Sequence, residues 1–277
     1  MTERFAVVSD IHAAGPQTRD AVWNNTMLFA RSLELLDTAI AQIRAAGLTS
    51  VLVLGDIAQH GDIEYVDRAL RALAAPDLEV LAVAGNHDVS WSPVTVDLAA
   101  ADVRGVTVLH PTFDYTLAGL PAGGQPLSSE DGGRLCTATV LPDPCSGDDL
   151  VLWATHYPVL SRATASADAG LRYPGDLLNL TDVQAPLLAR TAPTLVLHGH
   201  LHVATVATLG ALLQLGVPAL VEWPHAWTSV TIDGDGSVSS ELHSVAPDIE
   251  PTNDTVLASP KQSWRFSAGA WSARQVT

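Results

Sequence analysis

The segment TLVLHGHLHVAT, residues 194–205, carries histidines at every second position where an apolar run ends: His198, His200 and His202. Histidine is the commonest protein ligand of transition metals. A single histidine after an apolar run is more often a hydrogen-bonded structural residue. The cluster therefore indicates a metal site only if other parts of the chain supply further ligands.

Four other apolar runs end abruptly in side chains that can bind a metal ion or transfer a proton. They are RFAVVSDIH (4–12), VLVLGD (51–56), EVLAVAGNHD (79–88) and LVLWATHYP (150–158), and their polar ends are Asp10, His12, Asp56, Asn86, His87, Asp88 and His156. Each has an ordinary explanation by itself, since an aspartate after a strand is usually a helix cap or a turn residue. In an α/β sheet, however, ligands gather beyond the carboxyl ends of the strands. The repeated pattern predicts one shared site.

The donors at these ends are too many for one catalytic zinc ion, which takes three protein ligands and a water. Two carboxylates, one amide and four imidazoles make seven donors: Asp10, His12, Asp56, Asn86, His156, His200 and His202. If one carboxylate bridges two ions, the set suits a two-metal site. Oxygen and imidazole donors without thiolate favour Mn²⁺, Fe or Zn²⁺ as the metal. Two ions roughly 3.5–4 Å apart can clamp the attacking and leaving oxygens of a phosphate ester.

The elements that must position these residues alternate between strand and helix. The five apolar runs are continuous, which is typical of strands buried on both faces. Between them, NTMLFARSLELLDTAIAQIRAAG has apolar residues at three- and four-residue spacing and stops at Gly47, and DIEYVDRALRALAAP stops before Pro76. This alternation predicts an α/β fold with parallel strands and right-handed crossovers.

Later segments favour antiparallel strands. GRLCTATVLPD and SVTIDGDGSVSSELHSV alternate as strands do, and DGDG is a hairpin turn signal. The uncharged stretch 203–221 is broken by Gln214, Gly216 and Pro218. These breaks favour two buried strands joined by a turn over a membrane span.

The chain is expected to form one domain over residues 1–246, followed by a tail, 247–277. The aromatic residues Trp264, Phe266 and Trp271 predict that the tail packs on the body or on the second subunit of a homodimer.

The composition narrows the classes of partner and the compartment. A net charge of −16 repels polyanions and disfavours nucleic acid as a partner, while a local metal centre can still attract one small anion. The N-terminus MTERFAVVSD lacks the pattern of a signal peptide, so we expect a cytoplasmic protein. Cys136 and Cys145 have no metal-site spacing and are expected to be free thiols, with a local disulfide as the alternative.

The polar blocks SDIH, LGDI, AGNHD, THYP and HGHLH, in this order over residues 9–202, resemble the calcineurin-like metallophosphoesterase superfamily. The resemblance implies a four-layer sandwich of two mixed β-sheets flanked by helices, with metals at the strand ends. It implies one metal on Asp10, His12 and His202, the other on Asn86, His156 and His200, and a bridge through Asp56. His198 falls outside the pattern and is expected to pack behind the ligands.

The resemblance also suggests a mechanism. Two cations that share Asp56 would lower the pKa of a bridging water, and the resulting hydroxide would attack phosphorus in line. The metals and the Asn86 amide would stabilise the added negative charge. His87 corresponds to the family histidine that faces the substrate, and it would protonate the leaving oxygen, with Asp88 orienting it.

The substrate is expected to be a small phosphodiester, with a cyclic nucleotide as the leading example. GDIAQHGDIEYVDRALRAL resembles bacterial class III cyclic-nucleotide phosphodiesterases, in which a glycine and an acidic–tyrosine pair likewise follow the GD block. Candidate substrate contacts are Asn86, His87, His60 and Trp23.

Three alternatives remain open. A nuclease is disfavoured, because the chain is acidic and has no basic tract for a long polyanion. A phosphomonoesterase would use the same metals and would need extra basic groups, for which Arg19, His60, Arg162 and Arg172 are candidates. A catalytically inactive scaffold on the same fold would be expected to have lost ligands, and this sequence has lost none.

Overall fold

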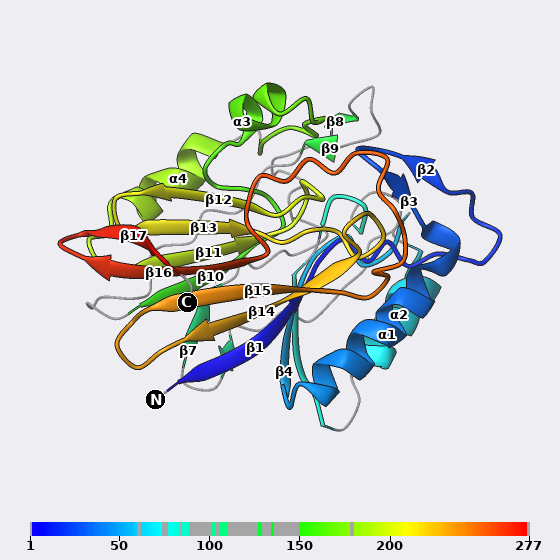
Figure 1. Cartoon of the computed structure of the whole chain (residues 1–277), viewed down its shortest axis with the longest axis horizontal. Coiled ribbons are helices and arrows are strands. Elements are labelled where there is room, and N and C mark those ends of the chain that lie inside the picture. Colours follow the sequence, from blue (N-terminus) through cyan, green and yellow to red (C-terminus); the bar gives the residue numbers. More distant parts are fainter. Residues whose placement is uncertain are drawn as a thin grey trace.

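Two β-sheets face each other at the centre of the protein (Figure 1). The computed structural model describes residues 2–59, 62–73, 77–83, 85–88, 150–177 and 180–275, and the backbone of four short strands between residues 101 and 135. His60, Cys136 and Cys145, and most of the GRLCTATVLPD segment, lie outside the described residues.

The first sheet has seven strands in the order β17-β16-β15-β14-β1-β4-β5. Their bounds are Glu3–Val8 (β1), Ser50–Leu54 (β4), Glu79–Val83 (β5), Ala226–Ile232 (β14), Val238–Ser244 (β15), Lys261–Ser267 (β16) and Ala270–Arg274 (β17). β1, β4 and β5 are parallel, and the strands from β14 to β17 are antiparallel. The sheet is therefore mixed, with its parallel part built from the first half of the chain.

The second sheet has six strands in the order β12-β13-β11-β10-β7-β6. Their bounds are Ala101–Val103 (β6), Val106–Leu109 (β7), Val151–Ala154 (β10), Thr194–His198 (β11), Thr205–Leu209 (β12) and Leu212–Gly216 (β13). Its four central strands are parallel, and an antiparallel strand closes each edge. Two small hairpins lie apart: β2 (Ala21–Val22) with β3 (Thr26–Met27), and β8 (Leu127–Ser128) with β9 (Arg134–Leu135).

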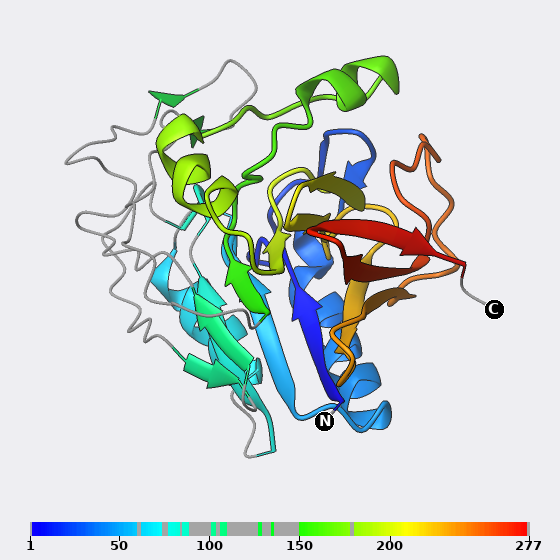
Figure 2. The ribbon, with the colours of Figure 1, turned by 90° about the vertical axis from the view of Figure 1, so that its left-hand side faces the viewer.

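Helices complete four layers, because the central strands of both sheets are buried on both faces. In β1, Phe5 and Val7 pack between the sheets against residues such as Leu197, while Ala6 and Val8 face a short 3₁₀ turn and helix, η1 (Phe29–Arg31) and α1 (Ser32–Ala45). Helix α2 (Ile63–Leu73) lies beside α1. Helices α3 (Ala163–Asp168) and α4 (Leu180–Leu188) lie on the side of the second sheet, as the turned view shows (Figure 2).

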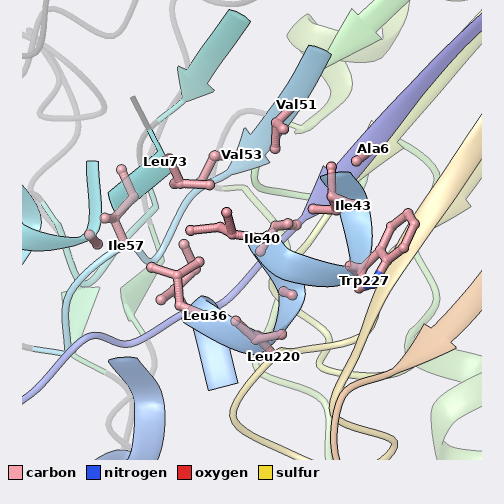
Figure 3. Packing of buried hydrophobic residues seen from close by; sticks show 14 of the residues in the cluster. Ala6, Leu36, Ile40, Ile43, Val51, Val53, Ile57, Leu73, Leu220 and Trp227 are labelled. Carbon is pink, nitrogen blue, oxygen red and sulfur yellow. The ribbon is translucent and has the colours of Figure 1, made fainter. Parts of the chain in front are cut away.

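The core under α1 shows why the predicted helix forms. Leu36, Ile40 and Ile43 recur at helical spacing and belong to one buried cluster with Val53 and Trp227 of the first sheet (Figure 3). Burial of each such side chain contributes about 1.5–3 kcal/mol relative to exposure. The helix ends where Gly47 adopts a φ of 71°, as the sequence predicted.

The four-layer arrangement of two mixed sheets flanked by helices, predicted from the sequence, is confirmed. The stretch 203–221 holds the β12–β13 hairpin, and no helix among the described residues has the length and apolar character to cross a bilayer. The last strands, β16 and β17, belong to the first sheet. Their residues Trp264 and Trp271 are buried in the core between the sheets, and the Trp271 indole N–H donates to the Ala211 carbonyl at 2.8 Å.

Candidate metal centre

Five strands from both sheets end at the same place, and their polar ends converge there. β1, β4 and β5 deliver residues 9–12, 55–58 and 85–88, while β10 and β11 deliver residues 155–156 and 199–202. The strand ends also approach through backbone hydrogen bonds, such as Asp10 N–H to the Gly55 carbonyl at 3.1 Å and Gly199 N–H to the His156 carbonyl at 3.0 Å. The parallel pairing of neighbouring strands sets the chain segments in register.

The backbone at these ends is strained. Five predicted ligands have left-handed φ angles: Asp10 (50°), His12 (45°), Asp56 (49°), His200 (68°) and His202 (62°). Such angles are uncommon outside glycine and cost of order 1–3 kcal/mol each. Strain of this kind persists where the surrounding structure enforces it, and it is concentrated at functional sites.

Two positions in the motifs have room only for glycine. A Cβ at Gly85 would lie 2.1 Å from Asp56 Oδ1, and a Cβ at Gly199 would lie 2.6 Å from Asp10 Oδ2. Any side chain at either position would displace a carboxylate of the cluster. The glycines of AGNHD and HGHLH therefore let the backbone approach the acidic ligands closely.

The first group of donors consists of Asp10, His12 and His202. His202 Nε2 lies 3.4 Å from Asp10 Oδ1 and 3.3 Å from His12 Nε2. One ligand atom from each of the three residues lies within 4.8 Å of the others, as donors to a common ion must. All three residues are buried, and Ser9 Oγ donates to Asp10 Oδ2 at 2.6 Å.

The second group is built around His156. Its Nε2 lies 3.0 Å from Asn86 Oδ1 and 3.4 Å from Asp56 Oδ2. The same Asp56 oxygen lies 3.7 Å from His12 Nε2 in the first group. Asp56 Oδ2 therefore stands between the two groups, where a bridging ligand has to be.

His200 carries the clearest sign of a missing partner. Its backbone N–H donates to both oxygens of Asp10, at 3.2 and 3.1 Å, and its ring lies 5.0 Å from the His156 ring between centroids. Its Nε2 atom is buried and has no hydrogen-bond partner among the described residues. An unsatisfied buried nitrogen is costly, and a metal ion would remove that cost. The donors present fit two ions of the Mn²⁺, Fe or Zn²⁺ type.

Without bound cations, two histidines of the cluster hold protons beside its carboxylates. Burial by itself would lower the pKa of both, but Asp56 raises the pKa of His156 to about 9, and Asp10 raises that of His202 to about 10. Burial would raise the pKa of Asp10, but the His202 charge lowers it to about 2. Bound cations would take the place of these protons.

Three histidine rings are oriented by acceptors at Nδ1. His156 Nδ1 lies 2.7 Å from the Leu54 carbonyl, His87 Nδ1 lies 2.6 Å from the Gln59 carbonyl, and His202 Nδ1 lies 2.7 Å from Glu222 Oε2. Because carbonyl and carboxylate oxygens only accept, each Nδ1 carries a proton, and in the neutral ring that binds a metal ion the lone pair lies on Nε2. For His156 and His202, Nε2 faces the cluster.

His87 lies at the edge of the cluster and is partly exposed. Its backbone N–H donates to Asp56 Oδ1 at 2.8 Å, and its ring lies 4.7 Å from the His12 ring between centroids. A ligand atom of His87 also lies within 4.8 Å of atoms of His12 and Asp56. It can therefore reach both the cluster and a molecule that approaches from solvent.

The predicted role of Asp88 needs correction. Its two oxygens accept from the backbone N–H groups of Ala58, at 3.0 Å, and Gly85, at 2.9 Å. Burial and the nearby Asp56 carboxylate raise the pKa of Asp88 to about 7. The Gln59 carbonyl, and not Asp88, orients the His87 ring. Asp88 instead joins the turn after β5 to the turn after β4.

Two other predicted residues lie away from the ligand groups. The Trp23 ring faces the Arg172 guanidinium, with 5.2 Å from Cζ to the ring centroid, and Arg172 N–H donates to Asn24 Oδ1 at 2.9 Å. His198 is buried, and its Nδ1 lies 2.8 Å from the Gly199 carbonyl, as expected for a residue that packs behind the ligands.

Sequence reasoning missed Glu222, whose carboxylate contacts the ring of His202. A signal was present: between residues 191 and 232, Glu222 is the only Asp, Glu, Lys or Arg. A single acidic residue in such an apolar stretch is buried at a cost that only specific partners offset. Periodicity does not identify those partners.

Comparisons with known proteins agree with this geometry. A sequence model of the family described as calcineurin-like phosphoesterase matches residues 3–204. Among solved structures, the chain is similar to a dimetal phosphatase from Danio rerio, with a TM-score of 0.62, 17% identity, and coverage of 90% of this chain and 97% of that one.

A second similar structure is purple acid phosphatase PPD1 from yellow lupin (Lupinus luteus), with a TM-score of 0.50 and 12% identity; the match covers 91% of this chain and 53% of that one. At these identities the two structures support the fold. No curated protein matches the sequence.

Proposed function

The chain belongs to the calcineurin-like phosphoesterase family and is a metal-dependent phosphoric ester hydrolase, and we propose that it hydrolyses a small phosphodiester with two metal ions. The observation that carries the proposal is the position of Asp56 Oδ2, 3.7 Å from His12 Nε2 and 3.4 Å from His156 Nε2. One carboxylate oxygen between two donor groups supports a site in which two ions would share it.

The residues divide into two sets of ligands. Asp10, His12 and His202 would hold one ion, Asn86, His156 and His200 would hold the other, and Asp56 would be shared. Bound ions of this kind supply an activated water and stabilise the negative charge that develops on the phosphoryl group.

His87, with a proton on each ring nitrogen, would donate the Nε2 proton to the leaving oxygen and become neutral. Its Nδ1 proton stays engaged by the Gln59 carbonyl. The ring is partly exposed beside the buried ligands, which suits a group that contacts substrate rather than metal. Asn86 contributes its amide N–H₂ to the phosphoryl oxygens while Oδ1 faces His156.

A small substrate suits the charge of the chain. The net charge of −16 opposes the approach of a long polyanion, whereas one phosphodiester group is attracted by the local cations. The predicted contact for a base is Trp23, whose partly exposed ring has the Arg172 guanidinium over one face and would offer the other to a flat group. We therefore propose a cyclic nucleotide as the first substrate to test.

A phosphomonoesterase is the second candidate, and Arg162 favours it. The Arg162 Nε is buried and has no hydrogen-bond partner among the described residues. A guanidinium with an unsatisfied donor could hold the extra charge of a phosphomonoester.

The test uses protein reconstituted separately with Mn²⁺, Fe²⁺ and Zn²⁺ and assayed on bis(p-nitrophenyl) phosphate, p-nitrophenyl phosphate and cyclic AMP. We expect the diesters to be hydrolysed faster than the monoester, and Asp56→Ala to be inactive. Glu241→Gln, an exposed acidic residue paired with Lys261, is the control that keeps activity. A strong preference for the monoester would establish the second candidate, and no hydrolysis of any of the three would contradict both.

A further inference from the structure

Glu222 joins the metal centre to the loop before α1. It is 1% exposed and lies in the segment between β13 and β14. Its Oε2 lies 2.7 Å from His202 Nδ1, and its Oε1 accepts a short hydrogen bond from the backbone N–H of Asn25. Both oxygens of the carboxylate are thus engaged by N–H donors from residues 20 and 197 positions away in the chain.

Asn25 in turn holds the segment that follows β15. The side chain is buried, and its Oδ1 accepts from Thr252 N–H at 2.9 Å, Thr252 Oγ1 at 3.1 Å and Asn253 N–H at 2.9 Å. Its Nδ2 donates to the Asn253 carbonyl at 3.0 Å. Figure 1 shows this segment, in orange, curving from β15 towards the β2–β3 hairpin that flanks Asn25.

These contacts form one continuous connection from a predicted metal ligand to the C-terminal part of the chain. It passes from His202 through Glu222 and Asn25 to residues 252–253. Beyond His202 and Asn25, its members lie outside residues 3–204, the range that matches the family. The connection therefore includes parts of this chain that the family match does not cover.

We infer that Glu222 is a positioning residue for the metal ligand His202, and that Asn25 docks residues 252–253 onto this support, so that the C-terminal segment stabilises the metal centre. The physical reason is the tautomer of His202. With its Nδ1 proton held by Glu222, Nε2 is directed at Asp10 and His12, 3.4 and 3.3 Å away, and in the neutral ring it offers its lone pair to an ion there. A carboxylate at this position also raises the basicity of the ring and hence its affinity for a cation.

Replacing the Glu222 carboxylate by an amide would remove one of its two hydrogen bonds. Glu222 accepts from two N–H groups, and an amide has only one accepting atom, so in Glu222→Gln one of the two donors would face an NH₂ group. The hydrogen bond to His202 or the one to Asn25 must therefore be lost. A role confined to packing would be preserved, because glutamine has nearly the same shape.

The experiment measures metal affinity directly, because the inference rests on His202 being a ligand in the proposed function. Mn²⁺ binding to the full chain is followed by calorimetry and by chelator competition, and Co²⁺ binding by its visible absorption spectrum. We expect Glu222→Gln to lower affinity for the tighter ion by roughly 10–100-fold and to change the Co²⁺ spectrum. Glu241→Gln is the matched control, a glutamate paired with exposed Lys261, and it should bind as the wild type does.

A second variant tests the C-terminal part of the connection. Asn25→Ala removes the side-chain hydrogen bonds to Thr252 and Asn253 but keeps the backbone N–H that Glu222 accepts. We expect faster hydrogen exchange in residues 250–255 and a smaller loss of metal affinity than in Glu222→Gln. If Asn25→Ala exchanges as the wild type does, the docking of the segment by Asn25 is refuted.

The outcomes separate this inference from the proposed function. If the wild type binds no ion, the two-metal assignment fails. If the wild type binds two ions and a folded Glu222→Gln binds them equally well with the same Co²⁺ spectrum, the positioning role fails. Should Glu222→Gln not fold, Glu222→Asp decides, because it keeps the charge but is too short to hold both donors: reduced Mn²⁺ affinity supports the inference, and unchanged affinity overturns it.

Discussion

The two donor groups of the metal centre are similar in geometry and differ in charge. The first has a carboxylate, Asp10, and a second carboxylate behind it, Glu222, which holds the ring of His202. The second has a neutral amide, Asn86, and a backbone carbonyl that holds the ring of His156. Asp56 stands between the groups. Negative charge around a cation strengthens its binding, so the first group should be the tighter site.

The largest expected effect comes from the residue that the two groups share. Asp56→Ala removes the oxygen between them and also the acceptor for the His87 backbone N–H. We expect loss of the second ion, weak binding of the first, and hydrolysis of bis(p-nitrophenyl) phosphate reduced to background. Metal content by elemental analysis and the rate of hydrolysis check both; two ions retained at full affinity would contradict the bridging assignment.

His87 is expected to affect the rate without affecting either group. His87→Ala removes the proton donor, so kcat should fall by about 10²–10⁴-fold while both ions still bind. Hydrolysis of an ester with a good leaving group such as p-nitrophenolate should suffer less than that of an alkyl ester, because a good leaving group needs less protonation. If kcat fell equally on both esters, or if the variant lost an ion, His87 would not be the proton donor to the leaving group.

The difference in affinity between the groups can be measured by stepwise loading. Titration with Mn²⁺ should show two steps separated by about tenfold or more in affinity, roughly 1.4 kcal/mol. Asp10→Asn should abolish the tighter step, and Asn86→Ala the weaker one. If Asn86→Ala removes the tighter step, the charge argument is wrong and geometry decides the order.

The smallest expected effect is on the stability of the metal-free protein as a function of pH. The raised pKa values of His156 and His202, about 9 and about 10, contribute stability that is complete below pH 6.5 and is lost as pH rises through those values. Burial lowers the pKa of His12 to about 3 and that of His198 to about 4, so stability is also lost as pH falls below 6.5.

Thermal unfolding of metal-free protein should therefore give the highest Tm near pH 6.5, with a decline towards pH 9 and towards pH 5. Mn²⁺ should flatten the alkaline side, because the ions replace the protons of both histidines. A metal-free Tm that stays constant between pH 6.5 and 9 would contradict the assigned charges.

Much of the fold was predictable because its signals are local. The runs VLVL and LVL within β4 and β11 are apolar at every position, which is typical of strands buried on both faces, and both strands are buried throughout. The three- and four-residue spacing before Gly47 likewise determined α1. The same runs end in the donor residues, so the place of the site at the strand ends followed from sequence.

The contacts of individual site residues were not predictable, and Asp88 is the clearest case. Its neighbour His87 was the obvious partner by sequence, yet Asp88 accepts from the Gly85 and Ala58 backbone, and the Gln59 carbonyl holds His87. Which acceptor meets a ring depends on the angle at which two turns from different strands approach each other. Side-chain chemistry alone leaves several acceptors equally suitable.

The amino-acid sequence by itself determined which residue types lie at the ends of the strands, while the closeness of Gly85 and Gly199 to the carboxylates appeared only in the structure. Only the tertiary structure decided that Glu222 meets His202 and that Asn25 holds residues 252–253, across separations of 20 and more than 200 positions. The spacing of apolar residues shows which side of a helix or strand is buried, and this is a property of the local segment. A hydrogen bond between distant segments leaves no periodic trace, because it depends on how the sheets and loops pack together.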